Sequence, residues 1–419
     1  MKILHLSTSD LDGGAARAAY RLHRGLMGHG VASEMLVRAR DSLDATVRAE
    51  KSLITKLGPP ANNMPLRSYP QRLKTRFSPQ WFPDILAKRI QTLNPDILQL
   101  HWVCNGYLRI ETLGSLQQIS MVWVLHDMWP FTGGCHYTED CDRYRQQCGN
   151  CPQLRSNQPK DLSHQIWHRK RKAWANLNLT IVSPSTWLAD CARSSSLFRD
   201  RPIQVIPHGL DLCKYQPIDR ALARKILHLP PDQKLVLFGA SPGTTSDPRK
   251  GLQLLEPALQ SLIESGWSNS LELVIFGNNP AAESTPTKFK THYLGYFQDD
   301  ISLALVYSAA DVMVVPSLQE AFGQTASEAL ACGTPVVAFR ATGLLDIIDH
   351  QENGYLADPF SAKSLAEGIT WVLGDDDRYH TLAIKAREKA LKDFSLDLQA
   401  SRYIDLYQSC LSVQNTPAK

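Results

Sequence analysis

Two glutamates eight residues apart, Glu320 and Glu328, lie where a buried strand is predicted to lead into a helix. The apolar run 311–316 predicts the strand, and the Ala-rich run 325–332, which stops at Gly333, predicts the helix. In open parallel α/β sheets, ligands bind beyond the carboxyl ends of strands, and the N–H groups of a helix start suit phosphate oxygens. Carboxylates at such a place accept hydrogen bonds from hydroxyl groups. The spacing therefore predicts a site for a sugar nucleotide.

The residues around this pair resemble a family signature. Glu320-Ala-Phe-Gly, Glu328-Ala and Gly333-Thr-Pro335-Val are similar to the Glu-x7-Glu motif of the family-4 glycosyltransferases. These are retaining enzymes with the GT-B fold, and the likeness is to bacterial enzymes of exopolysaccharide and lipopolysaccharide biosynthesis. The resemblance implies that Glu320 is catalytic and faces the donor sugar's hydroxyls, while Glu328 takes the ribose hydroxyls. It also implies that the donor's phosphates meet the backbone amides of Phe322, Gly323, Gln324 and Thr325.

A basic pair precedes a glycine in the same half of the chain. Arg249-Lys250-Gly251 follows the predicted strand 235–239 through a loop rich in Ser, Thr and Pro. The resemblance implies that Lys250 supplies the cation for the donor's diphosphate, where it would stabilise the charge that builds on the leaving group. The family usually has an arginine directly after the strand, but this chain reads Gly239-Ala240-Ser241, so Arg249 is the predicted replacement. Such a basic pair substitutes for Mg²⁺, so no catalytic metal is expected.

Two further segments of the front half fit the same interpretation. Gly13-Gly14 separates the predicted strand 2–7 from the predicted helix 15–27 and is similar to the family's donor-binding Gly-Gly loop. Because glycine has no Cβ, the backbone there can approach a phosphate closely. His126 ends the predicted strand 121–126 and resembles the family's catalytic histidine, whose ring contacts the transferred sugar; His101 lies similarly and ranks below it. A G-x-G-x-x-G fingerprint is missing, which argues against a nicotinamide dehydrogenase.

Four of the nine cysteines lie within 17 residues, as Cys135, Cys141, Cys148 and Cys151. The final Cys-x2-Cys has a chelating spacing, and a cytoplasmic chain disfavours stable disulfides. Tetrahedral thiolate ligation would order the insert 135–151 just beyond His126. A structural zinc ion is therefore the favoured prediction, with paired disulfides and free thiols as the alternatives.

The remaining pattern predicts two doubly wound domains. Short Val/Ile/Leu-rich runs alternate with helical segments, as in parallel sheets with crossover helices. The resemblance implies that this α/β protein is of the GT-B class, with two Rossmann-like domains facing each other across a cleft. Pro and Gly in the segment 206–211 place the boundary between a domain 1–210 and a domain 211–393. The resemblance implies that the first lies on the acceptor side and that the second binds the nucleotide sugar. The resemblance also implies that the segment 394–419 crosses back as a helix onto the first domain. The stretch 41–83 is polar and poor in periodicity, which predicts a solvated loop or a flap.

Composition and charge narrow the range of partners. The chain has 419 residues with 43% hydrophobic and 21% charged side chains, which excludes disordered, collagen-like and disulfide-scaffold classes. It has no apolar run long enough to span a bilayer, and its first residues read as a strand rather than a signal peptide. We therefore predict a cytoplasmic protein. Residues 1–210 carry a net charge of +11 against an overall +4, which favours an anionic partner or peripheral contact with the inner face of the membrane.

The resemblance, with which these observations agree, implies a retaining hexosyltransferase-type glycosyltransferase of cell-surface polysaccharide biosynthesis. Its donor would be a UDP- or GDP-linked sugar, and its acceptor a glycan or a polyprenyl-diphosphate-linked glycan. One alternative is a non-hydrolysing sugar-nucleotide epimerase, and a catalytically inactive sugar-nucleotide sensor is another. A third, from a different class, is a nucleic-acid-binding protein with a four-cysteine zinc module. Its basic residues are scattered without an aromatic-interleaved stripe, so no nucleic acid is expected.

Overall fold

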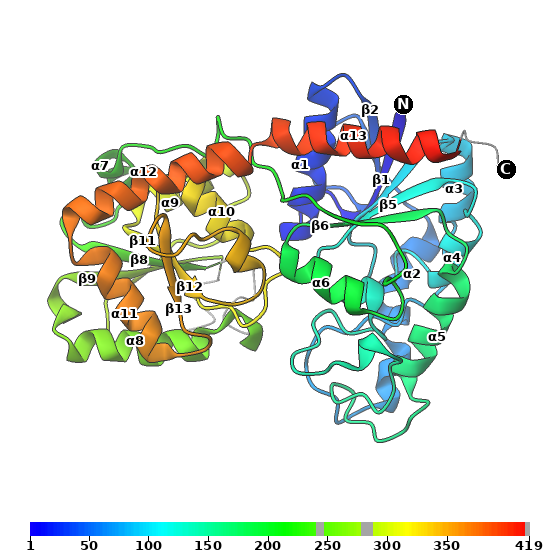
Figure 1. Cartoon of the computed structure of the whole chain (residues 1–419), viewed down its shortest axis with the longest axis horizontal. Helices are drawn as coiled ribbons and strands as arrows, with labels where there is room; N and C mark the ends of the chain where they lie inside the picture. The colour runs from blue at the N-terminus through cyan, green and yellow to red at the C-terminus, as the bar shows by residue number, and fades with distance from the viewer. Residues whose placement is uncertain (240–246, 278–287, 415–419) are drawn as a thin grey trace. The chain divides into compact units, whose positions relative to one another are not determined.

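The computed structural model describes residues 1–239, 247–277 and 288–414. Its contacts divide the chain into two compact units, shown with their elements in Figure 1. Unit 1 comprises Met1–Pro207 together with the chain from Gln399 onward, and unit 2 comprises His208–Leu398. The division falls inside the segment 206–211, where Pro207 and Gly209 interrupt regular structure.

Unit 1 contains a seven-stranded sheet in the order β3-β2-β1-β4-β5-β6-β7. All neighbouring strands pair in parallel, and the order reverses direction at β1, which lies between β2 and β4. The strands are β1 Lys2–Ser9, β2 Ala32–Ala39, β3 Val47–Ala49, β4 Ile97–Leu100, β5 Ser120–Val124, β6 Leu179–Ser183 and β7 Ile203–Val205.

Unit 2 contains a six-stranded parallel sheet in the order β10-β9-β8-β11-β12-β13. Here the order reverses between β8 and β11, which pair directly. The strands are β8 Lys234–Gly239, β9 Leu271–Phe276, β10 Thr291–Tyr293, β11 Val312–Val315, β12 Val336–Phe339 and β13 Gly354–Ala357. The prediction of two doubly wound Rossmann-like halves is confirmed.

Helices connect the strands in both units. Those of unit 1 are α1 Gly14–Gly28, α2 Leu53–Asn62, α3 Leu86–Leu93, α4 Ile110–Gly114, α5 Leu162–Trp174 and α6 Thr186–Ser194. Those of unit 2 are α7 Arg220–Ile226, α8 Leu252–Glu264, α9 Asp300–Ala309, α10 Gln324–Ala331, α11 Ala362–Leu373 and α12 Asp376–Asp393, and α13 Leu396–Gln414 ends the described chain. Short 3-10 turns are η1 Met64–Ser68, η2 Trp129–Phe131, η3 Arg143–Arg145, η4 Pro248–Lys250, η5 Trp267–Asn269 and η6 Thr342–Asp346.

The apolar strands of unit 2 are buried on both faces. In β8, Leu235 and Leu237 belong to a core with α9 and α10, whereas Val236 and Phe238 belong to the opposite core with α8 and α11. Successive strand residues point to opposite faces. A strand covered by helices on both sides therefore reads as an unbroken apolar run, which is why these strands were predictable from sequence.

The last helix, α13, packs against unit 1. Tyr403, Leu406 and Tyr407 share a core with Ile3 of β1 and Leu22 of α1. The hydroxyl of Tyr407 also donates to Oε1 of Gln99 in β4 at 2.7 Å. Packing and a buried hydrogen bond thus tie the C-terminal segment to the first sheet.

The prediction of a loop over the whole of 41–83 was wrong. This stretch holds β3, α2 and η1. The Ser52 side chain caps α2 by accepting a hydrogen bond from the Thr55 N–H. Gly58 lies so close to Gly106 that a Cβ at Gly58 would stand 2.3 Å from the Gly106 carbonyl oxygen. The helix is therefore held by a tertiary contact that hydrophobic periodicity does not reveal. The strands β3, β7, β10 and β13 were also missed, because runs of three or four residues carry too short a pattern.

Candidate functional site

The loop between β11 and α10 brings the first predicted glutamate into a charged cluster in unit 2. Nζ of Lys250 lies 2.5 Å from Oε1 of Glu320, and the Ser317 hydroxyl donates to the same oxygen at 2.9 Å. Nη1 of Arg249 is 3.8 Å from the other carboxylate oxygen. Burial by itself would raise the pKa of Glu320, but the charges of Lys250 and Arg249 outweigh it and hold the pKa below its usual value. Glu320 is thus an ionised, hydrogen-bonded carboxylate.

Two loops that are distant in sequence interlock to build this cluster. The Leu318 N–H donates to the Arg249 carbonyl at 2.8 Å, which joins the loop after β11 to the turn η4. Gly251 follows Lys250 with φ +79°, and a Cβ there would stand 1.8 Å from the Pro316 carbonyl oxygen. Only glycine fits both the left-handed backbone and this close approach. Gly251 therefore permits the contact that positions Lys250 beside Glu320.

The start of α10 lies directly beyond Glu320. Gly323 caps the helix with φ +109°, and a Cβ there would come within 2.7 Å of Leu344. Gln324 and Thr325 are the first two residues of α10, so their N–H groups stand at the positive end of the helix dipole. The Phe322 side chain is buried and meets His208 and Phe394 edge to face. These contacts of Phe322 thus hold the start of α10 against the core of unit 2.

The second glutamate is held by a residue that the sequence did not single out. Glu328 is buried, and its Oε2 accepts a hydrogen bond of 2.8 Å from the hydroxyl of Tyr307 in α9. Burial raises the pKa of Tyr307, and the Glu328 carboxylate raises it further, so the phenol stays protonated and keeps donating. Thr342 was also missed, although its Oγ1 accepts from the Glu320 N–H at 3.1 Å. Tyr307 lies in an apolar helix and reads as a core residue, so no sequence signal marked it.

Unit 1 holds the remaining predicted donor-binding residues. Gly13 caps α1 with φ +86°, and a Cβ there would meet no atom of the described residues within 4 Å. Gly14 is the first residue of α1. The backbone at this turn is therefore approachable, and the helix start adds N–H groups and a positive dipole end.

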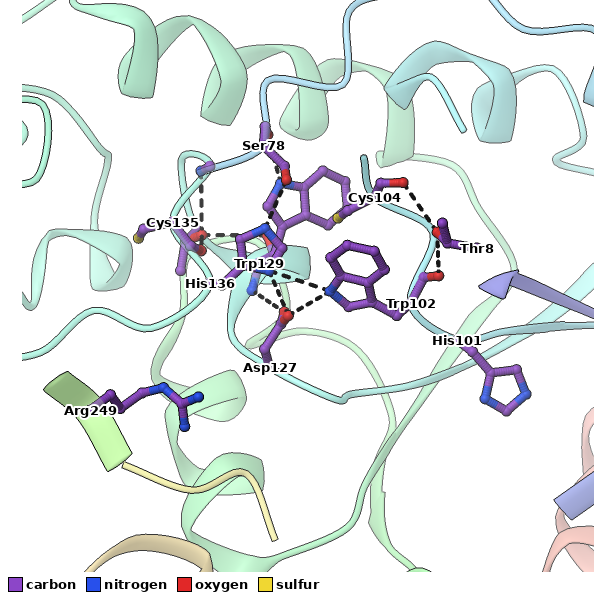
Figure 2. Close-up of polar contacts among 12 residues, drawn as sticks. Thr8, Ser78, His101, Trp102, Cys104, Asp127, Trp129, Cys135, His136 and Arg249 are labelled. Carbon is purple, nitrogen blue, oxygen red and sulfur yellow. Dashed lines mark hydrogen bonds and ion pairs between the residues drawn. The ribbon is translucent and has the colours of Figure 1, made fainter. Parts of the chain in front are cut away.

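His126 follows β5, and its neighbour Asp127 is the centre of a buried polar network (Figure 2). Oδ2 of Asp127 accepts from Nδ1 of His136 at 2.6 Å and from Nε1 of Trp102 at 2.8 Å. The other ring nitrogen of His136 bonds the Ser78 hydroxyl at 2.8 Å. Burial would raise the pKa of Asp127, but His136 and these donors lower it overall, so the carboxylate is ionised. Burial lowers the pKa of His126 to about 4, which leaves its ring neutral at pH 7.

The four clustered cysteines, Cys135, Cys141, Cys148 and Cys151, line one cavity of about 20 Å³. All nine cysteines of the chain lie in the described residues, and all are free thiols. Burial raises the pKa of both Cys148 and Cys151, although a backbone N–H of Gly133 lowers that of Cys148 and those of Leu154 and Gln153 lower that of Cys151. As the side chains stand, the described residues contain no group of three or more His, Cys, Asp or Glu that could hold a metal ion. The structure gathers the thiols but does not arrange them for ligation.

The architecture is that of a GT-B glycosyltransferase. It has two Rossmann-like units, and at the strand ends of the second unit it has a cation, two glutamates and a helix start. Two family profiles match this chain: "Glycosyltransferase Family 4" over residues 12–214 and "Glycosyl transferases group 1" over residues 219–389. The chain belongs to these glycosyltransferases, as the sequence predicted.

Relatives and solved structures agree with this assignment. A D-inositol 3-phosphate glycosyltransferase of Corynebacterium glutamicum is 29% identical over 309 residues, which is 70% of each chain. A protein of the same name from Xylanimonas cellulosilytica is 34% identical over 225 residues, about half of either chain. Among solved structures, sucrose-phosphate synthase from Thermosynechococcus elongatus superposes with a TM-score of 0.69 at 19% identity, covering 99% of this chain and 100% of that one. Anabaena HepE in complex with UDP-glucose has a TM-score of 0.67 at 17% identity, covering 98% and 100%.

Proposed function

We propose that this glycosyltransferase transfers a sugar from a nucleoside-diphosphate donor, with retention of anomeric configuration, to a glycan or polyprenyl-diphosphate-linked acceptor in cell-surface polysaccharide biosynthesis. The observation that carries the proposal is the ion pair of Lys250 and Glu320, held by interlocking loops immediately before the start of α10. A cation and a helix N-terminus suit a diphosphate, and a carboxylate suits sugar hydroxyls. The HepE structure is described as a complex with UDP-glucose, which supports a UDP-linked donor.

The proposed reaction needs only the residues already described. An acceptor hydroxyl attacks C1 of the donor sugar while the bond between C1 and the diphosphate oxygen breaks on the same face. The acceptor's proton passes to the departing diphosphate, so the products are the glycoside and the nucleoside diphosphate. Lys250, Arg249 and the amides from Phe322 to Thr325 stabilise the charge on the leaving group. Glu320 orients the sugar hydroxyls, Glu328 takes the ribose hydroxyls, and His126 contacts the transferred sugar.

An exposed apolar surface on α2 supports an acceptor at the membrane. Leu53, Ile54 and Leu57 of α2 are exposed, and Trp81, whose Nε1 donates to the Ala61 carbonyl at 3.2 Å, lies beside the end of this helix. From residue 51 to residue 76 the chain has six basic residues and no acidic one. Apolar side chains flanked by cations suit an anionic lipid surface. No helix among the described residues has the length and apolar character that crossing a bilayer requires.

Membrane contact through α2 is tested by measuring how much protein sediments with phosphatidylglycerol vesicles and how much with phosphatidylcholine vesicles. We expect binding to the anionic vesicles alone, weakened by salt and by Leu53→Ser combined with Leu57→Ser. Leu43→Ser is the control, because Leu43 is a leucine of unit 1 outside this surface and is even more exposed than Leu53 and Leu57. Equal loss in the control, or no binding by the unaltered chain, would contradict membrane contact through α2.

The reaction itself is tested in two steps. A thermal-shift screen of UDP- and GDP-sugars should show a rise in Tm with the true donor. Release of nucleoside diphosphate from that donor is then measured with and without glycan and lipid-linked acceptors. Release that requires an acceptor and forms a glycoside of the donor's anomeric configuration supports the proposal. Conversion of the donor without any acceptor would identify an epimerase instead.

We further propose that the cysteine cluster holds a structural zinc ion. The shared cavity of the four thiols and the N–H groups directed at Cys148 and Cys151 support it. The insert 135–151 contains only the turn η3, and an insert so poor in regular structure gains order from a cross-link. Ligation requires the cysteine side chains to turn into the cavity that they line.

A further inference from the structure

Three imidazole rings form a hydrogen-bonded chain across three adjacent strands of unit 1. His5 lies in β1, His101 directly follows β4, and His126 follows β5 by two residues; these strands are neighbours in the sheet. Nδ1 of His5 lies 2.9 Å from Nε2 of His101, and Nδ1 of His101 lies 3.3 Å from Nε2 of His126. The chain therefore begins inside the sheet and ends at the predicted catalytic histidine.

The rings meet edge to edge rather than face to face. The centroids of His5 and His101 are 5.2 Å apart with an interplanar angle of 18°, and those of His101 and His126 are 5.5 Å apart at 29°. Each centroid separation exceeds the corresponding N···N distance by about two ring radii, which is the largest excess that the geometry allows. Each N···N line therefore runs nearly along the line between the centroids, which directs an N–H in one ring plane at the lone pair of the next.

The donor in each of these hydrogen bonds follows from His5, the histidine inside the sheet. Nε2 of His5 is buried and has no hydrogen-bond partner among the described residues. The nearby His23 does not serve, because its two ring nitrogens bond the hydroxyls of Ser33 and Thr46. A buried N–H without an acceptor costs more than a buried lone pair without a donor, and orphaned N–H groups are rarer. The proton of the neutral His5 ring is therefore on Nδ1.

The remaining protons follow one by one. When His5 donates from Nδ1, Nε2 of His101 must accept and carries no proton. His101 is then neutral with its proton on Nδ1, and it donates to Nε2 of His126. That nitrogen is in turn unprotonated, so His126 is neutral with its proton on Nδ1.

We propose that His101, backed by His5, is a positioning residue that keeps His126 in the neutral Nδ1–H form. In that form Nε2 of His126 is occupied by the bond from His101, so the ring acts by donating from Nδ1 to an oxygen and not as a general base. This role rests on the proposed function, but the tautomer does not. The pKa values agree with neutral rings: burial lowers that of His126 to about 4 and that of His5 well below its usual range.

The tautomer is tested by nitrogen NMR on the full chain labelled with ¹⁵N-histidine at pH 7, with His126 assigned by comparison with His126→Gln. We expect Nδ1 of His126 to carry the proton and Nε2 to have the shift of an unprotonated nitrogen. His101→Asn keeps an N–H donor near the place of Nδ1 and should preserve this pattern. His101→Phe keeps a buried ring without a donor and should shift His126 toward the Nε2–H form. A proton on Nε2, or on both nitrogens, in the unaltered chain would overturn the proposal.

Turnover adds a second readout once a donor is known. We expect His101→Phe to lower kcat about tenfold with donor binding kept, and His101→Asn to restore most of it. His23→Gln is the matched control, because His23 is a buried histidine beside His5 that does not belong to the hydrogen-bonded series of His5, His101 and His126. Equal loss in His101→Asn and His101→Phe would mean that only packing matters. A correct tautomer without any transferase activity would refute the proposed function and leave the proton assignment standing.

Discussion

The ion pair of Lys250 and Glu320 allows a structural role to be separated from a catalytic one. Lys250→Met removes the cation 2.5 Å from Oε1 of Glu320, where the two side chains are only 21% and 12% exposed. Breaking a fully buried pair costs about 3–5 kcal/mol. Ser317 still donates to the stranded carboxylate and Arg249 still lies 3.8 Å away, so we expect a loss of about 2 kcal/mol.

A second substitution distinguishes the two roles. In Lys250→Met with Glu320→Gln the stranded charge is gone, so the free energy of unfolding should return to within about 1 kcal/mol of the unaltered chain. Turnover should fall at least about 100-fold in the single variant and stay low in the double variant, because the leaving diphosphate has lost its cation. Lys234→Met is the control: it breaks the exposed pair with Asp376 and should leave the free energy of unfolding almost unchanged.

The assays are urea unfolding followed by tryptophan fluorescence and release of nucleoside diphosphate from the donor found by thermal shift. An unchanged m value would show that the same two-state transition is compared. Recovery of turnover in the double variant would refute the catalytic role and leave Lys250 as a structural partner of Glu320. Near-normal turnover in Lys250→Met alone would remove it from the reaction.

Three further predictions concern stability and metal content. Acid should destabilise unit 1, because burial lowers the pKa of His23 to about 4. Between pH 6.5 and pH 5 the unfolded chain therefore binds more protons at His23 than the folded chain does. This difference should lower the free energy of unfolding by about 2 kcal/mol. Urea unfolding at both pH values should show a loss smaller by that amount in His23→Gln. Gly251→Ala should cost about 3 kcal/mol because a Cβ there collides with backbone, whereas Gly266→Ala, also at positive φ but in open space, should cost about 1 kcal/mol. A larger loss of stability in Gly266→Ala than in Gly251→Ala would contradict this explanation. Elemental analysis of protein made with zinc should find about one equivalent, lowered by Cys148→Ser and unchanged by Cys213→Ser, an exposed cysteine outside the cluster. Metal-free, fully folded protein would show the zinc prediction to be wrong.

The sequence alone determined the class of fold and the first site residues. Buried parallel strands read as apolar runs, and the Glu320 to Glu328 spacing lies within one strand, loop and helix, so local pattern was sufficient. It did not show α2, whose place depends on the contact of Gly58 with Gly106, two residues far apart in the chain.

Only the tertiary structure decided which side chains meet. Lys250 and Glu320 are 70 positions apart and come together because β8 pairs with β11. The hydrogen-bonded histidines require the order β1-β4-β5, in which β1 pairs with β4 although β2 and β3 separate them in the sequence. His5 therefore carried no functional signal by itself. The physical reason is the range of the interactions. Periodicity, caps and turns act over a few residues, whereas ion pairs and ring-to-ring hydrogen bonds depend on strand order and register, which emerge only when the whole sheet is assembled.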